Sequence, residues 1–154
     1  MVTGHLIHLL AVPSVLIVDD DPVIQLLLRV NFEMDGFEVL ASDDGEQALA
    51  AIRQSPPDLV LLDVVMPKLN GFEVLAALKS DEATKSIPIA LLSAKSSESD
   101  RQAGIDAGAD LYITKPFDPI KLLAKVKPLV VSVADVPENV GDQDVDDKGV
   151  STSN

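Results

Sequence analysis

Apolar residues along the chain form five short runs that alternate with longer stretches of helical period. Most of these runs are continuously apolar, which is typical of parallel strands covered on both faces. The expected strands span residues 15–18, 37–41, 59–62, 87–92 and 111–113. The expected helices begin near Pro22, Gly45, Gly71, Ser97 and Asp118.

The first expected helix carries apolar residues at intervals of about one turn. They are Val23, Leu27, Val30 and Met34, at i, i+4, i+7 and i+11. This spacing predicts that the four side chains form one buried stripe. Asp21 followed by Pro22 suits an N-cap and first turn, and Gly36 suits the C-terminal stop.

Strands and helices that alternate in this way predict an α/β fold. Five strand–helix units imply a doubly wound parallel sheet, with right-handed crossovers and helices on both faces. In such sheets the functional crevice lies beyond the carboxyl ends of the strands. The residues that directly follow each apolar run are therefore the candidates for chemistry.

The regular pattern covers residues 14–131, which we expect to form a single domain. Residues 1–13 are mildly apolar but lack a basic region and a signal-cleavage site, so we expect a dispensable extension. Residues 132–154 contain six acids, one lysine and no apolar period, which predicts a solvated, disordered tail. No apolar run approaches the roughly 18 residues needed to cross a bilayer, so we expect a cytoplasmic protein without membrane contact.

Composition narrows the classes of function. The chain has no cysteine, which excludes disulfides, thiolate nucleophiles and cysteine–zinc sites. Its two histidines, His5 and His8, lie outside the regular pattern, which argues against a histidine-based catalytic site. The net charge of −13 argues against nucleic-acid binding, because phosphate contacts depend on clustered Lys and Arg. Cations and basic protein surfaces are the expected partners.

Polar residues follow four of the expected strands, and a parallel sheet would bring them to one crevice. Two ionised carboxylates 4 Å apart repel by about 4 kcal/mol at an effective dielectric of 20. A cation would relieve this repulsion, and oxygen ligands of this kind suit Mg²⁺. The residues are Asp19, Asp20 and Asp21 after the first strand, Asp63 after the third, Ser93 after the fourth and Lys115 after the fifth.

This set of groups suits phosphoryl transfer to a carboxylate. Mg²⁺ and Lys115 would offset charge on the transferring group, and Ser93 would donate a hydrogen bond to it. Each residue alone has a plainer interpretation: Asp21 as a helix cap, Ser93 as a turn residue, Lys115 as a solvated lysine. Their convergence from four strand ends favours the chemical interpretation.

Four motifs resemble the receiver domain of two-component response regulators, over roughly residues 14–131. They are VLIVDDDP at 15–22, DLVLLDVVMPKLNG at 58–71, IPIALLSAK at 87–95 and AGADLYITKPF at 107–117. The resemblance implies a flavodoxin-like sheet with strand order 2-1-3-4-5.

The resemblance also implies roles for individual residues. Asp63 matches the phosphoacceptor. Asp20 matches a direct Mg²⁺ ligand, Asp19 an acid that acts largely through water, and the backbone carbonyl of Val65 the third protein ligand.

Further roles concern the response to phosphorylation. Ser93 matches the switch hydroxyl and Lys115 the phosphate-binding lysine. Tyr112 matches the aromatic residue that turns inward when the hydroxyl moves, although a half-buried strand aromatic needs no such role. The loop after the acceptor is matched by Met66, Pro67 and Gly71.

The implied function is a phosphorylation-driven binding switch. The donor would be a sensor histidine kinase or a histidine phosphotransfer protein, and the domain would catalyse only its own phosphorylation and dephosphorylation. No DNA-binding output region is expected after residue 131, because the remaining segment is short and acidic. Output would pass to a downstream protein through the helix that begins near Ser97, the strand at 111–113 and the helix that begins near Asp118.

Two alternatives remain open. Asp19-x-Asp21 after an apolar strand also fits haloacid-dehalogenase-like phosphatases, with Asp19 as nucleophile and Asp21 as general acid. Those enzymes resemble one another in a later acidic pair, which the residues after Lys115 do not provide. The second alternative is a receiver-like scaffold that binds partners without phosphorylation.

Overall fold

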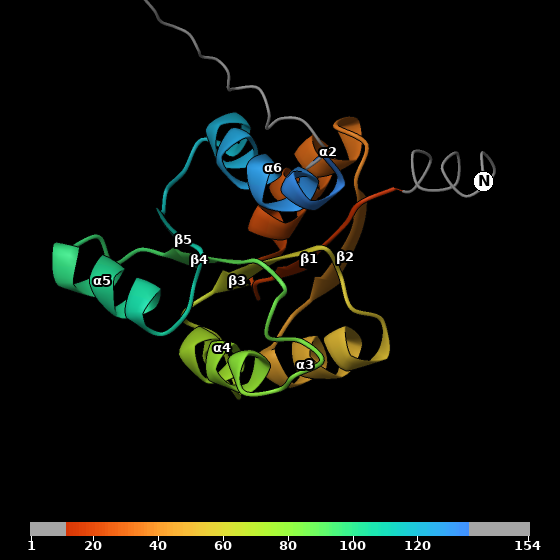
Figure 1. Cartoon of the computed structure of the whole chain (residues 1–154). Coiled ribbons are helices and arrows are strands. Elements are labelled where there is room, and N and C mark those ends of the chain that lie inside the picture. The colour runs from red at the N-terminus through yellow and green to blue at the C-terminus, as the bar shows by residue number, and fades with distance from the viewer. Residues whose placement is uncertain (1–11, 136–154) are drawn as a thin grey trace, which may run out of the picture.

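The structure is a computed structural model that describes residues 12–135. A five-stranded parallel sheet lies between two layers of helices, with strand order β2-β1-β3-β4-β5 (Figure 1). The predicted fold class and strand order are confirmed. The strands are β1 (Ser14–Val18), β2 (Glu38–Ser42), β3 (Leu59–Asp63), β4 (Ile89–Ser93) and β5 (Leu111–Thr114).

The helices cover both faces of the sheet (Figure 1). α2 and α6 lie side by side on one face, α3 and α4 lie on the other, and α5 lies near the β5 edge. The helices are α2 (Pro22–Met34), α3 (Gly45–Gln54), α4 (Gly71–Lys79), α5 (Glu98–Asp106) and α6 (Pro119–Asp135). The last helix continues four residues beyond the expected domain limit at 131.

The core consists of two apolar clusters, one on each face of the sheet. β3 and β4 are buried along their whole length, as their continuous apolar runs predict. One cluster contains Leu28 and Phe32 of α2 with Val126 of α6. The other is built by α3 and α4. The sheet is therefore held rigidly, and its carboxyl edge is a fixed platform for the polar residues at the strand ends.

Side-chain caps fix where the helices begin next to that edge. The side chain of Asp21 accepts a hydrogen bond of 2.9 Å from the backbone N–H of Val23. The predicted N-cap of α2 is therefore confirmed. Asn70 forms a capping box with Glu73 at the start of α4. Gly36 has a positive φ of 95°, as expected of the residue that follows a helix.

The predicted buried stripe of α2 is wrong. Its four members are exposed, together with Leu26: Val23, Leu27, Val30 and Met34. The face that packs on the sheet is instead formed by Ile24, Leu28 and Phe32, at i, i+4 and i+8. The helix thus carries two apolar stripes on different sides, and periodicity alone cannot tell which one faces the sheet.

Within residues 12–135, no helix has both the length and the apolar character required to cross a bilayer.

Candidate functional site

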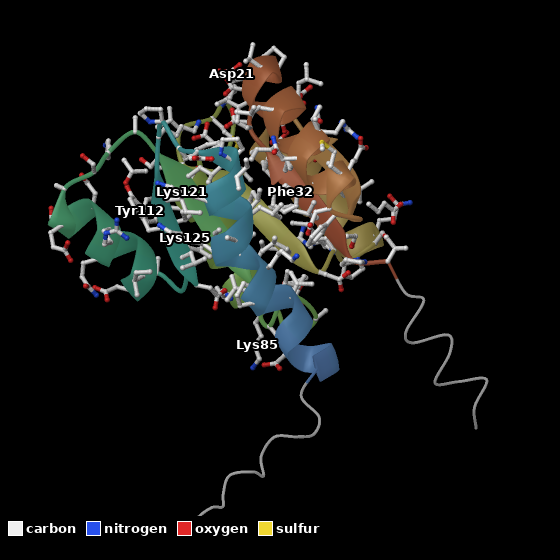
Figure 2. All side chains as sticks on the ribbon, turned by 90° about the horizontal axis from the view of Figure 1, so that it is seen from above. Asp21, Phe32, Lys85, Tyr112, Lys121 and Lys125 are labelled. Atoms are coloured by element: carbon white, nitrogen blue, oxygen red, sulfur yellow. The ribbon has the colours of Figure 1, made fainter. Side chains whose placement is uncertain are left out.

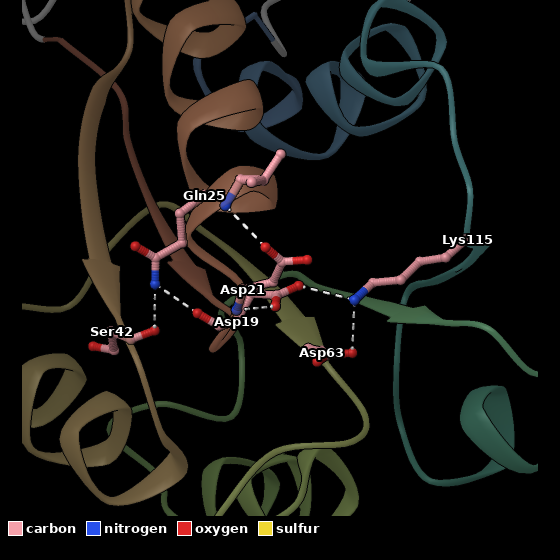
Figure 3. Close-up of polar contacts among 7 residues, drawn as sticks. Asp19, Asp21, Gln25, Ser42, Asp63 and Lys115 are labelled. Carbon is pink, nitrogen blue, oxygen red and sulfur yellow. Dashed lines mark hydrogen bonds and ion pairs between the residues drawn. The ribbon is translucent and has the colours of Figure 1, made fainter.

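The site begins at the end of β1, where Asp19 is completely buried. Its carboxylate accepts the backbone N–H of Asp21 at 2.9 Å. The side-chain amide of Gln25 donates to the backbone carbonyls of Asp19 and Ser42 (Figure 3). It also donates to the carboxylate of Asp43. The turn after β1 is therefore tied both to α2 and to the end of β2.

Asp63 ends β3 and is 5% exposed. Lys115, which follows β5, reaches across the carboxyl edge of the sheet to both acids (Figure 3). Its Nζ lies 2.9 Å from Oδ2 of Asp19 and 3.1 Å from Oδ1 of Asp63. Residues from three different strand ends thus meet in one charge cluster, as the strand-end rule predicts.

Burial and the neighbouring carboxylate of Asp19 raise the pKa of Asp63 above its ordinary value. Lys115 and the backbone N–H of Val65 act in the opposite direction but do not cancel the effect. Burial would lower the pKa of Lys115, but its hydrogen bonds and ion pairs with Asp19 and Asp63 outweigh burial and raise that pKa. The lysine therefore stays charged, and the two acids compete for it.

Asp19, Asp20 and Asp63 could together hold a metal ion. One carboxylate oxygen from each lies within 4.8 Å of the others. Asp19 and Asp63 are buried, whereas Asp20 is exposed and leaves a path to solvent. The cluster offers hard oxygen ligands and one open side, and it carries more negative charge than Lys115 can balance. These properties suit Mg²⁺ better than a softer metal.

The hydroxyl of Ser93 and the ring of Tyr112 are linked through one residue. Ser93 Oγ accepts the backbone N–H of Lys95 at 3.0 Å. The hydroxyl of Tyr112 donates to the backbone carbonyl of Lys95 at 2.7 Å. The backbone of Lys95 therefore contacts both side chains, its N–H at Ser93 and its carbonyl at Tyr112.

Tyr112 is already buried in this structure. A Cβ placed on Gly104 of α5 would lie 2.8 Å from its ring, so only glycine lets α5 approach this closely. The guanidinium of Arg101 lies 5.7 Å from the centre of the ring. The inward position of Tyr112 is therefore supported from α5.

The loop between β3 and α4 also requires a glycine. A Cβ on Gly71 would lie 2.5 Å from the backbone oxygen of Asp63, so the start of α4 can approach Asp63 only without a side chain there. In the same loop Lys68 adopts a positive φ of 68° and pairs with the carboxylate of Asp44 at 3.6 Å. These contacts fix the segment that directly follows Asp63.

The structure brings together most of the predicted site. Asp19, Asp20, Asp63 and Lys115 form one cluster. Ser93 lies at the adjoining strand end, where β4 pairs with β3. The role of the Val65 carbonyl as a metal ligand stays a prediction.

Sequence reasoning missed Gln25 and Lys68. Gln25 lies six residues after Asp19, which places it at the end of the first turn of α2, where it reaches the end of β1. It lies close to the buried side of α2, which periodicity alone does not identify. Lys68 gave no signal, because its partner Asp44 lies in a different strand–helix unit.

Comparison with known proteins agrees with this geometry. The family model described as response regulator receiver domain matches residues 15–127. The chain is a member of the response regulator receiver family.

Two curated relatives show how far the similarity extends. The chain is 39% identical over 140 residues to the DNA-binding dual master transcriptional regulator RpaA of Synechocystis, covering 91% of this chain and 58% of that protein. It is 45% identical over 114 residues to the phosphate regulon transcriptional regulatory protein PhoB of Pseudomonas aeruginosa, covering 74% of this chain and 50% of the relative. This receiver thus spans 58% of the length of the first regulator and 50% of that of the second.

Solved structures give the same result. The chemotaxis response regulator CheY4 of Vibrio cholerae superposes with a TM-score of 0.73 at 32% identity, covering 77% of this receiver and 99% of CheY4. The Francisella response regulator 1452 receiver domain superposes with a TM-score of 0.75 at 32% identity, covering 79% and 98%. The match therefore extends over almost the whole length of both solved structures, CheY4 and the Francisella receiver domain.

Proposed function

We propose that Asp63 accepts a phosphoryl group from a phosphohistidine, carried by a sensor histidine kinase or a histidine phosphotransfer protein. The observation that supports this most directly is the position of Asp63. It ends a fully buried strand, and its carboxylate shares one ammonium with Asp19. An anionic nucleophile held beside a fixed cation suits attack on an anionic phosphorus centre.

In the proposed transfer, one carboxylate oxygen of Asp63 forms a bond to phosphorus. The bond between phosphorus and the donor imidazole nitrogen breaks, and the imidazole keeps the electron pair. As Asp63 gives up its negative charge to the new bond, the ammonium of Lys115 pairs with a phosphoryl oxygen instead. The side chains of Asp19, Asp20 and Asp63, with the carbonyl of Val65, would hold Mg²⁺, which when bound offsets charge on the phosphoryl oxygens.

The switch would use the link through Lys95. Ser93 accepts a hydrogen bond from the Lys95 N–H, so its own hydrogen is free to donate to a phosphoryl oxygen on Asp63. Movement of Ser93 toward that oxygen loosens its bond to Lys95, whose carbonyl holds Tyr112. An electrostatic event at Asp63 thereby changes the packing of β5 against α5.

Output would pass to a downstream protein through the surface formed by α5, β5 and α6. Tyr112 lies on β5 and Gly104 on α5, so a change in the ring position alters this surface directly. The domain would catalyse only its own phosphorylation and dephosphorylation.

The test is phosphorylation by acetyl phosphate with Mg²⁺, followed by mass spectrometry. We expect one acid-labile phosphoryl group on the wild type, none on Asp63→Asn, and reduced labelling on Asp19→Asn. Asp106→Asn, a change of the same type at an exposed position on α5, serves as control and should label normally.

Two outcomes would contradict the proposal. Labelling that survives Asp63→Asn but is lost with Asp19→Asn would favour the phosphatase-like mechanism. The structure gives Asp21 a simpler role, because its Oδ1 caps α2. Absence of labelling with every donor tested would favour a scaffold that works without phosphorylation.

A further inference from the structure

A basic groove lies between α5, β5 and α6. It encloses about 210 Å³, and its lining includes three cations, Arg101, Lys121 and Lys125. Figure 2 shows Lys121 and Lys125 extending from α6 on the side of α5, with Tyr112 close by on β5. The chain as a whole carries a net charge of −13, so a groove of this sign stands out from the rest of the molecule.

The positive charge of the groove is not balanced locally. Within residues 12–135, no carboxylate lies within ion-pair distance of any of these three cations. Lys127, on the same helix, does have such a partner, since its Nζ lies 3.1 Å from Asp35. Asp118 is the acid that lines the groove, and its Oδ1 accepts the backbone N–H of Ile120 at 2.9 Å as a helix cap.

One of the cations is held in place. Arg101 donates to the backbone carbonyl of Tyr112 at 3.2 Å, and its guanidinium lies over the ring of the same residue. Lys121 and Lys125 are one turn apart on α6, so they present their charges along a line. The groove therefore offers three cations, one of them held in place, to an extended acidic chain.

We propose that an acidic segment of this same chain, residues 142–147, docks in the groove. The segment reads DQDVDD and carries the acids Asp142, Asp144, Asp146 and Asp147. Its charge is opposite to that of the groove, and four acids in six residues match three cations that have no carboxylate of their own within residues 12–135.

The connection to α6 has the length that docking requires. Lys125 lies ten residues before the end of α6, which is about 15 Å along a helix. Asp142 follows that end by seven residues, which as a flexible chain cover about 15 Å on average and at most about 24 Å. The tether holds the acids at an effective concentration on the order of millimolar near the groove.

The contact is electrostatic and exposed, so it forms and breaks readily and weakens with salt. It is therefore compatible with the solvated character expected of the segment from its composition. Docking also has a consequence for output, which rests on the proposed function. A downstream protein that binds the surface of α5, β5 and α6 must displace the segment.

The absence of cysteine permits a direct test on the full chain. A nitroxide spin label attached to Val145→Cys reports which backbone amides lie near the segment, through paramagnetic broadening of their NMR signals. We expect broadening centred on Arg101, Lys121 and Lys125. Raising the salt from 0.1 to 1 M shortens the screening length from about 10 to about 3 Å, and broadening should fall to less than about half.

Charge variants of the labelled chain separate the groove from nonspecific attraction. Lys121→Gln with Lys125→Gln should abolish the focused broadening. Arg53→Gln with Lys85→Gln removes the same charge from α3 and from a lysine already paired with Glu82, and should leave it intact. Broadening that is uniform over the surface, or equal in the two double variants, would overturn the proposal. No phosphorylation is involved, so the result is independent of the role of Asp63.

Discussion

Asp44 is a buried carboxylate that makes two stabilising contacts. It caps α3 by accepting the backbone N–H of Gln47 at 2.9 Å, and it pairs with Lys68 in the loop after Asp63. The hydrogen bond from Gln47 is the largest influence and lowers its pKa. Burial opposes this shift and Lys68 reinforces it.

This depressed pKa predicts a pH-dependent contribution to stability. A carboxyl group with a lower pKa in the folded state stabilises the fold above its unfolded value of 3.8, and the contribution is lost as the pH falls through the folded pKa. We expect Asp44→Asn to be less stable than the wild type at pH 7, and the difference to disappear in acid. Urea unfolding at pH 7 and at a series of pH values below 3.8 measures it. A gap independent of pH, or equal to that of the exposed Glu46→Gln, would contradict the prediction.

Val65 and Lys95 are the residues that we expect to affect how long the phosphorylated state lasts. Both line a cavity of about 380 Å³ that also contains Ser93, and the side chain of Val65 is largely exposed. By the family resemblance, these positions flank the path of the attacking water. Valine cannot orient a water, and a charged lysine cannot accept a proton from one.

We therefore expect slow self-hydrolysis in the wild type. Val65→Asn with Lys95→Glu should lose phosphate at least about fivefold faster, because both new side chains can hold water in line with the acyl phosphate. Phosphate release followed over time is the measurement. Val65→Leu with Lys95→Arg keeps bulk and charge and should behave like the wild type. If the first double variant is no faster, both side chains only point to solvent.

At the scale of an element, the two apolar faces of α2 contribute differently to the free energy of unfolding. Leu28→Ala removes a fully buried side chain and should cost about 2–5 kcal/mol of unfolding free energy. Leu26→Gln and Val30→Gln change exposed positions and should each stay within about 0.5 kcal/mol. Denaturant titration distinguishes them. A large loss from Val30→Gln would show that the outward stripe is covered.

The same helix shows what sequence can and cannot determine. Its start at Pro22 and its end before Gly36 follow from local chemistry, because caps and positive φ angles depend on neighbouring residues. Its buried face does not, because Val30 and Leu28 are equally apolar and only the sheet selects between them. Gln25 was missed for the same reason, since its partners Ser42 and Asp43 lie in another unit.

At the scale of the whole molecule, residues 12–135 contain a five-stranded sheet together with the helices that cover both of its faces. Removing residues 136–154 is therefore expected to change the melting temperature by less than about 5 °C, roughly 1 kcal/mol. Docking of the acidic segment adds little, because exposed ion pairs contribute about 0–1 kcal/mol. Removing residues 1–11 is expected to be equally silent. Calorimetry of each truncation checks these boundaries, and a larger drop would show that a boundary is misplaced.

The position of Lys115 late in the sequence also has a consequence for folding during synthesis on the ribosome. β1 pairs with β3, so the nascent chain can bring Asp19 and Asp63 together once Asp63 has emerged. Their shared cation lies 52 residues further along and follows only after about 3 to 10 seconds of synthesis. If that pairing formed before Lys115 was made, the two carboxylates would face each other without their cation, at a cost of about 4 kcal/mol at a separation of 4 Å. The half-made sheet is therefore expected to stay open, or to close around a divalent cation, until its fifth strand is made.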